Sequence, residues 1–397
     1  MPDSHGLSIT NVAIFDGESE HLTEGPIRIV DGRIAEVGAT VGADDRVLDA
    51  QGGVAIPGLI DAHFHAYAAA VEIGAIARMP LSYLALVGAH RLRRALARGF
   101  TTVRDVAGGD AGLDQAIRQG LVRAPRYLYA GPALSQTGGH GDGRAAGEDC
   151  CGHQLFAEVV DGVDNLRRSV RDRFRNGAHV IKIMASGGVV SPSDPIRAAQ
   201  YSPDEIRAVV EEATRRGSYV AAHAYSTEAI QVCVEAGVRS IEHGNLLDAP
   251  TAAAMAAHGA FLVPTLVTYD AMERRGAEIG MSASARAKNR EVLQAGRHAL
   301  ELARAAGVPI GFGSDLMGDL EDDQLLGLRL QAEVDGLLPT LRAATSGNAA
   351  LIGRPELGHI AADAAADLVV LPVNPFDHPE ALWSGHRTVV RAGEIVD

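Results

Sequence analysis

The chain has 397 residues, of which 47% are apolar and 45 are glycine, so it is neither a small single-core domain nor a disordered chain. Its net charge is −14, which excludes the basic face that nucleic acid or an anionic membrane requires. A compact enzyme with a small-molecule substrate is the class that these values favour.

The cysteines and the first residues predict a cytoplasmic protein. The chain has three cysteines, and the adjacent pair Cys150 and Cys151 does not make a disulfide framework. Residues 1–10 lack the basic and apolar regions of a secretory signal, and no apolar run reaches the about 18 residues that span a membrane. Residues 148–153 add His153 to the two cysteines, but without CxxC spacing we interpret them as loop packing rather than a zinc site.

Both ends of the chain predict short strands. Residues 7–17, 25–38 and 45–53 alternate between apolar and polar positions and are separated by turn residues such as Asp-Gly. Residues 366–375 and 386–397 show the same pattern, and chain termini often lie close together. We therefore expect residues 1–53 and 355–397 to form one composite β-sandwich domain.

Residues 54–354 alternate between predicted strands and predicted helices. Helical stretches rich in Ala, Arg and Glu, such as 86–99, 202–217 and 287–307, each end in Gly, which is a C-cap signal. Short apolar strands joined by helices predict a (β/α)8 barrel, an α/β fold. A doubly wound open sheet is the alternative, but it usually carries a Gly-rich fingerprint after its first strand, where this chain has His-Phe-His. The eight strands are expected at 53–63, 100–106, 126–132, 179–185, 219–225, 238–244, 260–266 and 308–315.

Polar residues gather at the ends of these predicted strands, which is the face where barrel active sites form. His63 and His65 end the first strand, and alternation places residues i and i+2 on one side of a strand. Two imidazoles from one strand are able to hold one metal ion. Taken alone, the pair is equally well explained as two surface histidines.

Lys182 adds a less common signal, because it stands between two isoleucines in the fourth predicted strand. A buried lysine is costly unless it is paired or neutral, so an ion pair with a core carboxylate is the alternative to a functional role. His223, His243 and Asp315 end three further strands. Each alone would be read as a core histidine or a helix cap, but their recurrence at strand ends predicts one set of metal ligands.

The motifs that contain these residues resemble the amidohydrolase superfamily, in its binuclear, carboxylated-lysine form. They are PGLIDAHFH, VIKIMASGG, VAAHAYS, IEHGN and GFGSD. The resemblance covers nearly the whole chain. It implies two divalent metal ions, with zinc expected, and an N6-carboxylysine at Lys182 that bridges them. His63, His65, Lys182 and Asp315 would hold the more buried ion, and Lys182, His223 and His243 the second.

The same resemblance implies a mechanism. Asp315 would take a proton from the hydroxide that bridges the metals and later give it to the leaving group, as general base and then general acid. The chain lacks a Gly-x-Ser-x-Gly elbow, which weakens a serine-hydrolase alternative. Deaminase relatives with one metal ion lack the lysine of the fourth strand.

Three further motifs resemble the Xaa-Pro dipeptidase, metallocarboxypeptidase and ochratoxinase-like branch. They are SQTGGHGD at 135–142, HAY at 223–225 and TTVRDVAG at 101–108. The resemblance implies that Tyr225 polarises the scissile carbonyl or contacts substrate, and that His140 binds a substrate carboxylate or the oxyanion. Barrel packing and a glycine-held turn are the respective alternatives. Arg104 is a candidate for a substrate carboxylate, but a structural pair with Asp105 or another barrel acid is favoured.

We expect hydrolysis of an amide or peptide bond in a small substrate, such as a dipeptide, an N-acyl amino acid or an ochratoxin-like compound. A cyclic amidohydrolase or a deaminase is the alternative, and a non-catalytic ligand-binding barrel is disfavoured because the ligand set is complete. The enzyme is expected to be a homo-oligomer. The acidic run at 319–323 is expected to be a solvated helix start, or else to line the site and favour cationic substrates.

Overall fold

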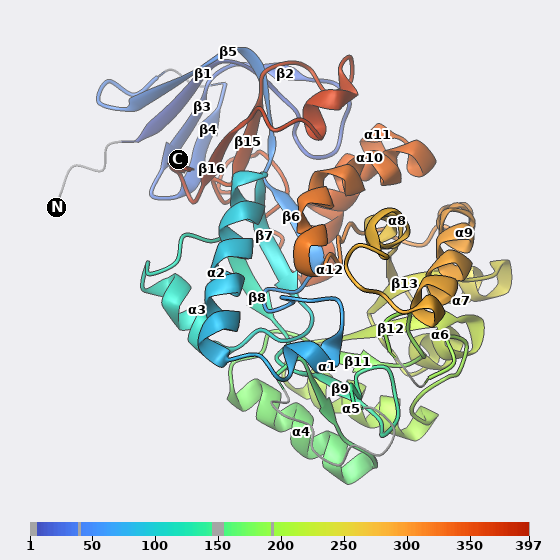
Figure 1. The fold of residues 1–397 in the computed structure, drawn as a ribbon. Coiled ribbons are helices and arrows are strands. Elements are labelled where there is room, and N and C mark those ends of the chain that lie inside the picture. The colour runs from blue at the N-terminus through green and yellow to red at the C-terminus, as the bar shows by residue number, and fades with distance from the viewer. Residues whose placement is uncertain (1–5, 39–40, 145–154, 192–193, 397) are drawn as a thin grey trace.

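The computed structural model describes residues 6–38, 41–144, 155–191 and 194–396. Cys150, Cys151 and His153 lie outside the described residues. One part of the molecule is a sheet built from both ends of the chain, and the other is a larger α/β unit (Figure 1). The described residues contain no helix long and apolar enough to cross a membrane.

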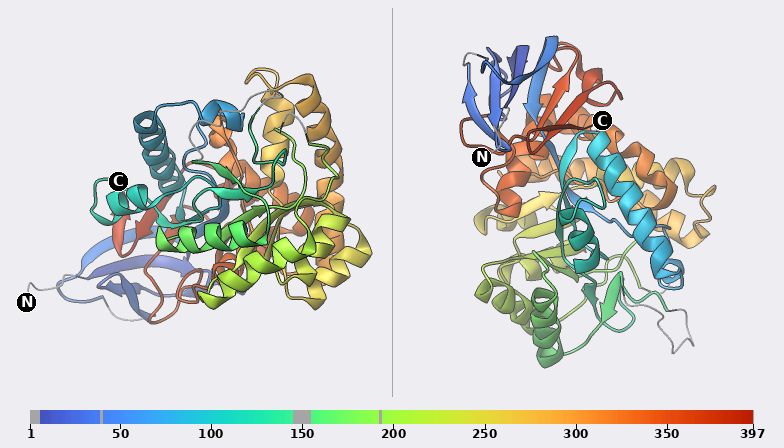
Figure 2. Two further views of the ribbon diagram at one scale, coloured as in Figure 1. Left: turned by 90° about the horizontal axis from the view of Figure 1, so that it is seen from below. Right: turned by 90° about the vertical axis from the view of Figure 1, so that its left-hand side faces the viewer.

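The terminal sheet joins strands that lie more than 300 residues apart in the sequence. Its eight strands run in the order β17-β16-β15-β5-β1-β3-β4, with β2 paired to β1. In Figures 1 and 2 the blue N-terminal strands and the red C-terminal strands lie side by side. The strands are β1 (Leu7–Ile14), β2 (Thr23–Glu24), β3 (Ile27–Val30), β4 (Arg33–Val37), β5 (Arg46–Pro57), β15 (Leu368–Leu371), β16 (Thr388–Arg391) and β17 (Glu394–Val396).

The larger unit contains parallel strands in two hydrogen-bonded groups, β6-β7-β8 and β10-β9-β11-β12-β13-β14. The backbone N–H of His179, before β11, donates to Tyr129 O in β8 at 2.8 Å. On the other side, Ala62 N of β6 donates to Phe312 O at 2.9 Å, and Ile310 bridges to Leu262 of β14. The strands are β6 (Leu59–Phe64), β7 (Phe100–Asp105), β8 (Arg126–Tyr129), β9 (Ala133–Ser135), β10 (Ala157–Val159), β11 (Ile181–Met184), β12 (Val220–Ser226), β13 (Ser240–Leu246) and β14 (Phe261–Val263).

Helices surround these parallel strands (Figures 1 and 2). The predicted helices at 86–99, 202–217 and 287–307 are α2, α5 and α9, and the glycines that follow them have φ values of 92°, 66° and 79°. Only a left-handed residue ends a helix in this way, which explains the three glycines. The α-helices are α1 (Ile73–Ile76), α2 (Leu81–Ala97), α3 (Ala111–Arg118), α4 (Val163–Arg175), α5 (Pro203–Arg215), α6 (Thr227–Glu235), α7 (Ala249–Ala257), α8 (Leu266–Arg275), α9 (Ala283–Ala305), α10 (Gln324–Asp335), α11 (Leu337–Arg342) and α12 (Asn348–Ile352).

Two predicted strands differ from the structure. The strand expected at 53–63 divides at Gly58, because its first part belongs to the terminal sheet as far as Pro57 and its second part is β6. A Cβ at Gly58 would lie 2.1 Å from Thr101 Oγ1, so this change of sheet requires glycine. The segment expected at 308–315 forms only the single bridge at Ile310, and it ends beside β6 at Asp315, whose φ is 50°.

The apolar side chains form several clusters, and one of them spans both parts. One cluster fills the terminal sheet, with Ile9, Ile27, Ile34 and Leu368 among its fully buried members. The largest cluster joins the parallel strands and their helices to β5 and β15 of that sheet, for example through Ile56. At about 25 cal/mol per Å² of apolar surface, such cores supply the main stabilisation and fix the strand ends that carry the polar residues described next.

Candidate active site

A cavity lies at the carboxyl ends of the parallel strands. Its polar wall is made by residues from β6, β11, β12, β13 and the segment after Phe312. Its apolar wall includes Ile73, Phe156, Met184 and Met272. The predicted residues that line it are His63, His65, His140, Lys182, His223, Tyr225, His243 and Asp315.

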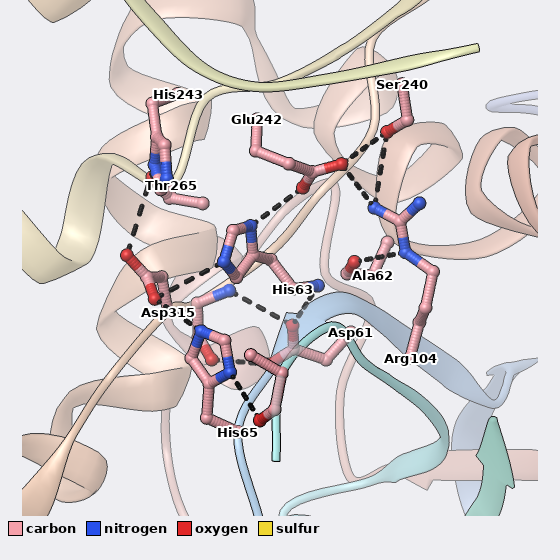
Figure 3. Close-up of polar contacts among 12 residues, drawn as sticks. Asp61, Ala62, His63, His65, Arg104, Ser240, Glu242, His243, Thr265 and Asp315 are labelled. Carbon is pink, nitrogen blue, oxygen red and sulfur yellow. Dashed lines mark hydrogen bonds and ion pairs between the residues drawn. The ribbon is translucent and has the colours of Figure 1, made fainter. Parts of the chain in front are cut away.

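Three of these residues already stand at the spacing of a metal site. His63, His65 and Asp315 each offer a ligand atom, and these atoms lie within 4.8 Å of one another. Asp315 Oδ1 lies 3.4 Å from His63 Nε2 and 3.1 Å from His65 Nε2 (Figure 3). Burial opposes charge on Asp315, but the neighbouring His63 and His65 outweigh it and lower the pKa of this carboxyl. The group therefore keeps the anionic oxygen that a divalent ion needs.

Hydrogen bonds on the outer side fix which nitrogen of each imidazole faces this group. His63 Nδ1 lies 2.7 Å from Glu242 Oε2 (Figure 3). His65 Nδ1 lies 3.2 Å from Ala107 O. Both partners only accept, so each Nδ1 is the donor and each Nε2 is the nitrogen that faces Asp315. This is the arrangement that metal-binding histidines require.

His223 and His243 extend the cluster across the cavity. Their ring centroids lie 4.6 Å apart, and the His243 ring lies 4.9 Å from that of His63. His223 Nε2 donates to Gly187 O at 3.0 Å, which leaves Nδ1 free. Burial, together with the nearby cationic groups, lowers the pKa values of His63, His223 and His243 well below the ordinary value, so the rings are neutral and able to ligate.

Lys182 is buried in this cluster with no hydrogen-bond partner for Nζ among the described residues. Burial lowers its pKa to about 8, against the opposing charges of Glu242 and Asp315. A buried amine without a partner is unfavourable, so a bound group at Nζ is the simplest explanation of this position. The donor set of four imidazoles, one carboxylate and one amine without a hydrogen-bond partner in the described part of the chain fits a pair of divalent ions.

His140 and Tyr225 complete the wall. The His140 ring stacks on that of His223 with centroids 4.2 Å apart, and its Nδ1 lies 3.0 Å from Ser191 Oγ. Burial lowers the pKa of His140 to about 4, so it is neutral near pH 7. Tyr225 is buried beside His243, and its hydroxyl lies 2.9 Å from the hydroxyl of Tyr269. Both side chains lie close enough to the cluster to touch a molecule bound there.

Comparison with known proteins agrees with this geometry. The model of the amidohydrolase family matches residues 54–396. The chain belongs to the amidohydrolase family. It is therefore a hydrolytic enzyme that acts on carbon–nitrogen bonds, and the family predicted from its motifs is confirmed.

Individual relatives of this amidohydrolase identify its branch. Ochratoxinase from Aspergillus niger is 31% identical over 94% of this chain and 84% of the relative. A prolidase solved with N-methylphosphonate-L-proline is 44% identical, with a TM-score of 0.96 over 98% of this chain and 99% of the other. An Xaa-Pro dipeptidase solved with methionine in its active site is 27% identical, with a TM-score of 0.89 over 99% and 100% of the two chains. The predicted branch is thus also confirmed.

Arg104 does not line the cavity of the amidohydrolase. Its side chain is fully buried, and its Nη2 donates to Glu242 Oε1 at 2.8 Å (Figure 3). Burial lowers the pKa of this guanidinium, but Glu242 outweighs that effect and raises it. The favoured structural pairing therefore accounts for Arg104, with Glu242 rather than Asp105 as its partner, and no exposed nitrogen remains for a substrate carboxylate.

The acidic run at 319–323 also points away from the cavity. It forms the short 3₁₀ helix Gly318–Asp323, and its carboxylates meet arginines of the neighbouring helices. Asp322 pairs with Arg98 at 3.0 Å and Asp323 with Arg274 at 2.7 Å. Glu321 pairs with the buried Arg91 at 3.2 Å. These ion pairs account for the run without a role in substrate choice.

Two residues of the site were missed from the sequence. Glu242 lies beside His243 in the motif IEHGN and holds both His63 and Arg104. Tyr269 reaches Tyr225 from the first turns of α8, where an aromatic residue is usually read as packing. A buried glutamate inside a strand is the signal that would have identified Glu242.

Proposed function

We propose that this amidohydrolase hydrolyses the amide bond between a small acyl group and an amino acid, in a dipeptide, an N-acyl amino acid or an ochratoxin-like compound. The proposal rests on Lys182, which is buried in the histidine cluster and has no hydrogen-bond partner among the residues that the structure describes. The relatives support it, since their names are ochratoxinase, prolidase and Xaa-Pro dipeptidase.

We further propose that the cluster holds two divalent ions, with zinc expected, and that Lys182 is an N6-carboxylysine. His63, His65 and Asp315 would bind one ion, and His223 and His243 the other, with the carboxylated Lys182 between them. A lysine whose pKa is about 8 has an appreciable neutral fraction near pH 7, which is the form that combines with carbon dioxide.

Such a metal pair supplies an activated water near neutral pH and a Lewis acid for the scissile carbonyl. The residues of the chain then complete the reaction. Asp315 accepts a proton during attack and returns it to the amine that leaves, because it is buried, anionic and close to His63 and His65. His140 and Tyr225 orient the carbonyl or the carboxylate of the substrate from the opposite wall.

The finer architecture belongs to the same proposal. Residues 54–354 would form a (β/α)8 barrel, because backbone hydrogen bonds join β8 to the start of β11 and the segment at 310–312 lies between β14 and β6. Residues 1–53 and 355–397 would form the composite β-sandwich domain around its own apolar cluster. A homo-oligomer in the cytoplasm is the expected form of the enzyme.

The decisive experiment measures metal content and products together. We expect purified protein to contain two ions per chain and to release a free amino acid from members of a dipeptide and N-acyl amino acid library. One ion per chain with release of ammonia would instead favour the cyclic-amide or deaminase alternative. Asp315→Asn should lose turnover, and unchanged turnover in that variant would contradict the role of Asp315.

A carboxylated lysine has its own signature. In protein prepared with ¹³C-bicarbonate, a carbamate carbon signal should be present in the wild type and absent in Lys182→Ala. The absence of that signal in a wild-type sample with two ions bound would contradict the carboxylysine.

A further inference from the structure

Lys288, in α9, makes three hydrogen bonds to the loop that follows β11. Its Nζ donates to Gly188 O at 3.1 Å, to Ser191 O at 3.0 Å and to Asp194 O at 2.7 Å. An ammonium group has three N–H donors, so all of its donors are used by backbone carbonyls of one loop. Lys288 itself lines neither the metal cluster nor the cavity above it.

The same three loop residues hold His140. Ser191 Oγ lies 3.0 Å from His140 Nδ1. Gly188 lies against the imidazole so closely that a Cβ there would come within 2.0 Å of the ring. Asp194 Oδ2 accepts from Gln200 Nε2 at 3.2 Å, and Gln200 Oε1 accepts from the backbone N–H of His140 at 3.0 Å. Each carbonyl that Lys288 binds therefore belongs to a residue that fixes the ring or the backbone of His140.

The choice of residue is a second, independent observation. The chain has 36 basic residues, and only two of them are lysines, Lys182 and Lys288. Arginine serves every other basic position, including the surface pairs. A planar guanidinium directs its donors outward in a fork, whereas the ammonium directs three donors tetrahedrally from one atom. Three carbonyls that converge on one point therefore require lysine.

We propose that Lys288 is a positioning residue that locks the loop after β11 and thereby fixes the imidazole of His140 over the candidate metal cluster. This inference rests on the proposed function only in so far as His140 contacts substrate. The ring uses Nδ1 for Ser191, and Nε2 is the nitrogen that remains for a bound molecule. A ring displaced by about 1 Å would cost up to about 100-fold in rate.

The first test measures the loop and the ring directly in metal-loaded protein, with Lys288→Met, Lys288→Arg and the control Arg197→Met. Arg197 joins the same loop to Glu291 of α9 through an exposed ion pair at 2.7 Å. Amide hydrogen exchange at Gly187 and Gly188, which donate to Ala198 O and Asp194 Oδ2, should accelerate about tenfold or more in both Lys288 variants and remain unchanged in the control. The ¹⁵N signals of the His140 ring should shift in the same two variants.

The second test asks whether Lys288 acts through His140. Lys288→Met should lower kcat/KM by about 10- to 100-fold with two ions still bound, and it should have little further effect when combined with His140→Ala. Lys288→Arg should not restore activity, because its donors do not converge.

Three results would each overturn the inference. Lys288→Met could lower kcat/KM equally in the wild type and in His140→Ala, or Lys288→Arg could be fully active. The third is amide exchange and His140 ring signals in the Lys288 variants that match the wild type. If the wild type hydrolyses no member of the substrate library, the proposed function fails, and the exchange and ring signals still decide the role of Lys288.

Discussion

The buried pair of Arg104 and Glu242 offers the most direct test of how the site is supported. Both side chains have no exposed surface. Arg104 donates to Glu242 Oε1 at 2.8 Å and to Ala62 O at 2.5 Å, and Glu242 also accepts from Ser240 Oγ at 2.5 Å. The other carboxylate oxygen holds His63 Nδ1 at 2.7 Å. Arg104 therefore places its positive charge beside the glutamate that holds a candidate metal ligand.

We expect Arg104→Met to destabilise the protein by about 3–5 kcal/mol, because it leaves the Glu242 carboxylate buried without its cation. Methionine is close to the arginine stem in shape, so the loss reports the missing charge and hydrogen bonds rather than a large cavity. The assay is the free energy of unfolding in urea at pH 7, with metal content measured on the same samples. We also expect weaker metal binding, by about 10- to 100-fold, since His63 loses a well-held partner.

Arg207→Met is the matched control, because Arg207 pairs with Asp204 at the same kind of distance, 2.7 Å, on the surface. An exposed pair of this kind contributes about 0–1 kcal/mol. If Arg104→Met and Arg207→Met lower the free energy of unfolding equally, the argument from burial is refuted. If stability falls but metal affinity does not, the link through Glu242 to His63 is refuted.

Three further predictions concern the loop, acid stability and the acidic run. Gly188→Ala should lower kcat/KM by about 10- to 100-fold with metal content unchanged, because its Cβ would meet the His140 ring; wild-type kinetics would contradict this contact. Hydrogen bonds from arginines lower the pKa of Glu212 from 4.5 to about 2, so Glu212→Gln should cost about 1–2 kcal/mol at pH 7. The difference from the wild type should persist above pH 4.5 and vanish as the pH falls toward 2, measured by urea unfolding at several pH values. Reversing the charge of Asp322 and Asp323 to lysine should lower the thermal midpoint and leave the ranking of substrates unchanged, and a changed ranking would restore their role in specificity.

Local periodicity was enough to predict where the candidate ligands lie. His63 and His65 share one side of β6 because alternation in a strand is a local property, and the parallel arrangement brings the ends of all strands to one face. Lys182 could also be singled out from the sequence, since it stands among isoleucines of a buried strand and burying a charged amine is costly in free energy. The helix ends followed from glycine in the same local way.

Contacts between segments that lie far apart in the chain could not be predicted from one sequence. Glu242 lies 179 residues from His63, and Tyr225 meets Tyr269 across 44 residues from a helix that reads as ordinary packing. The division of the strand at Gly58 depends on Thr101, which lies in the next strand. The rarity of lysine is the one compositional signal that would have drawn attention to Lys288, although its role needed the positions of the three carbonyls.

Three residues of the site have strained backbone conformations, which the sequence does not indicate and which decide the substitutions that are informative there. His243, Thr265 and Asp315 have φ values of 77°, 45° and 50°, which residues other than glycine rarely adopt. Each such residue costs about 1–3 kcal/mol and persists only where its surroundings fix it. The conformation of Asp315 is fixed by the hydrogen bond that its backbone N–H donates to His63 O at 2.8 Å. Aspartate and asparagine tolerate this conformation better than alanine, so Asp315→Asn removes charge while keeping the turn, whereas Asp315→Ala would confound lost chemistry with lost geometry.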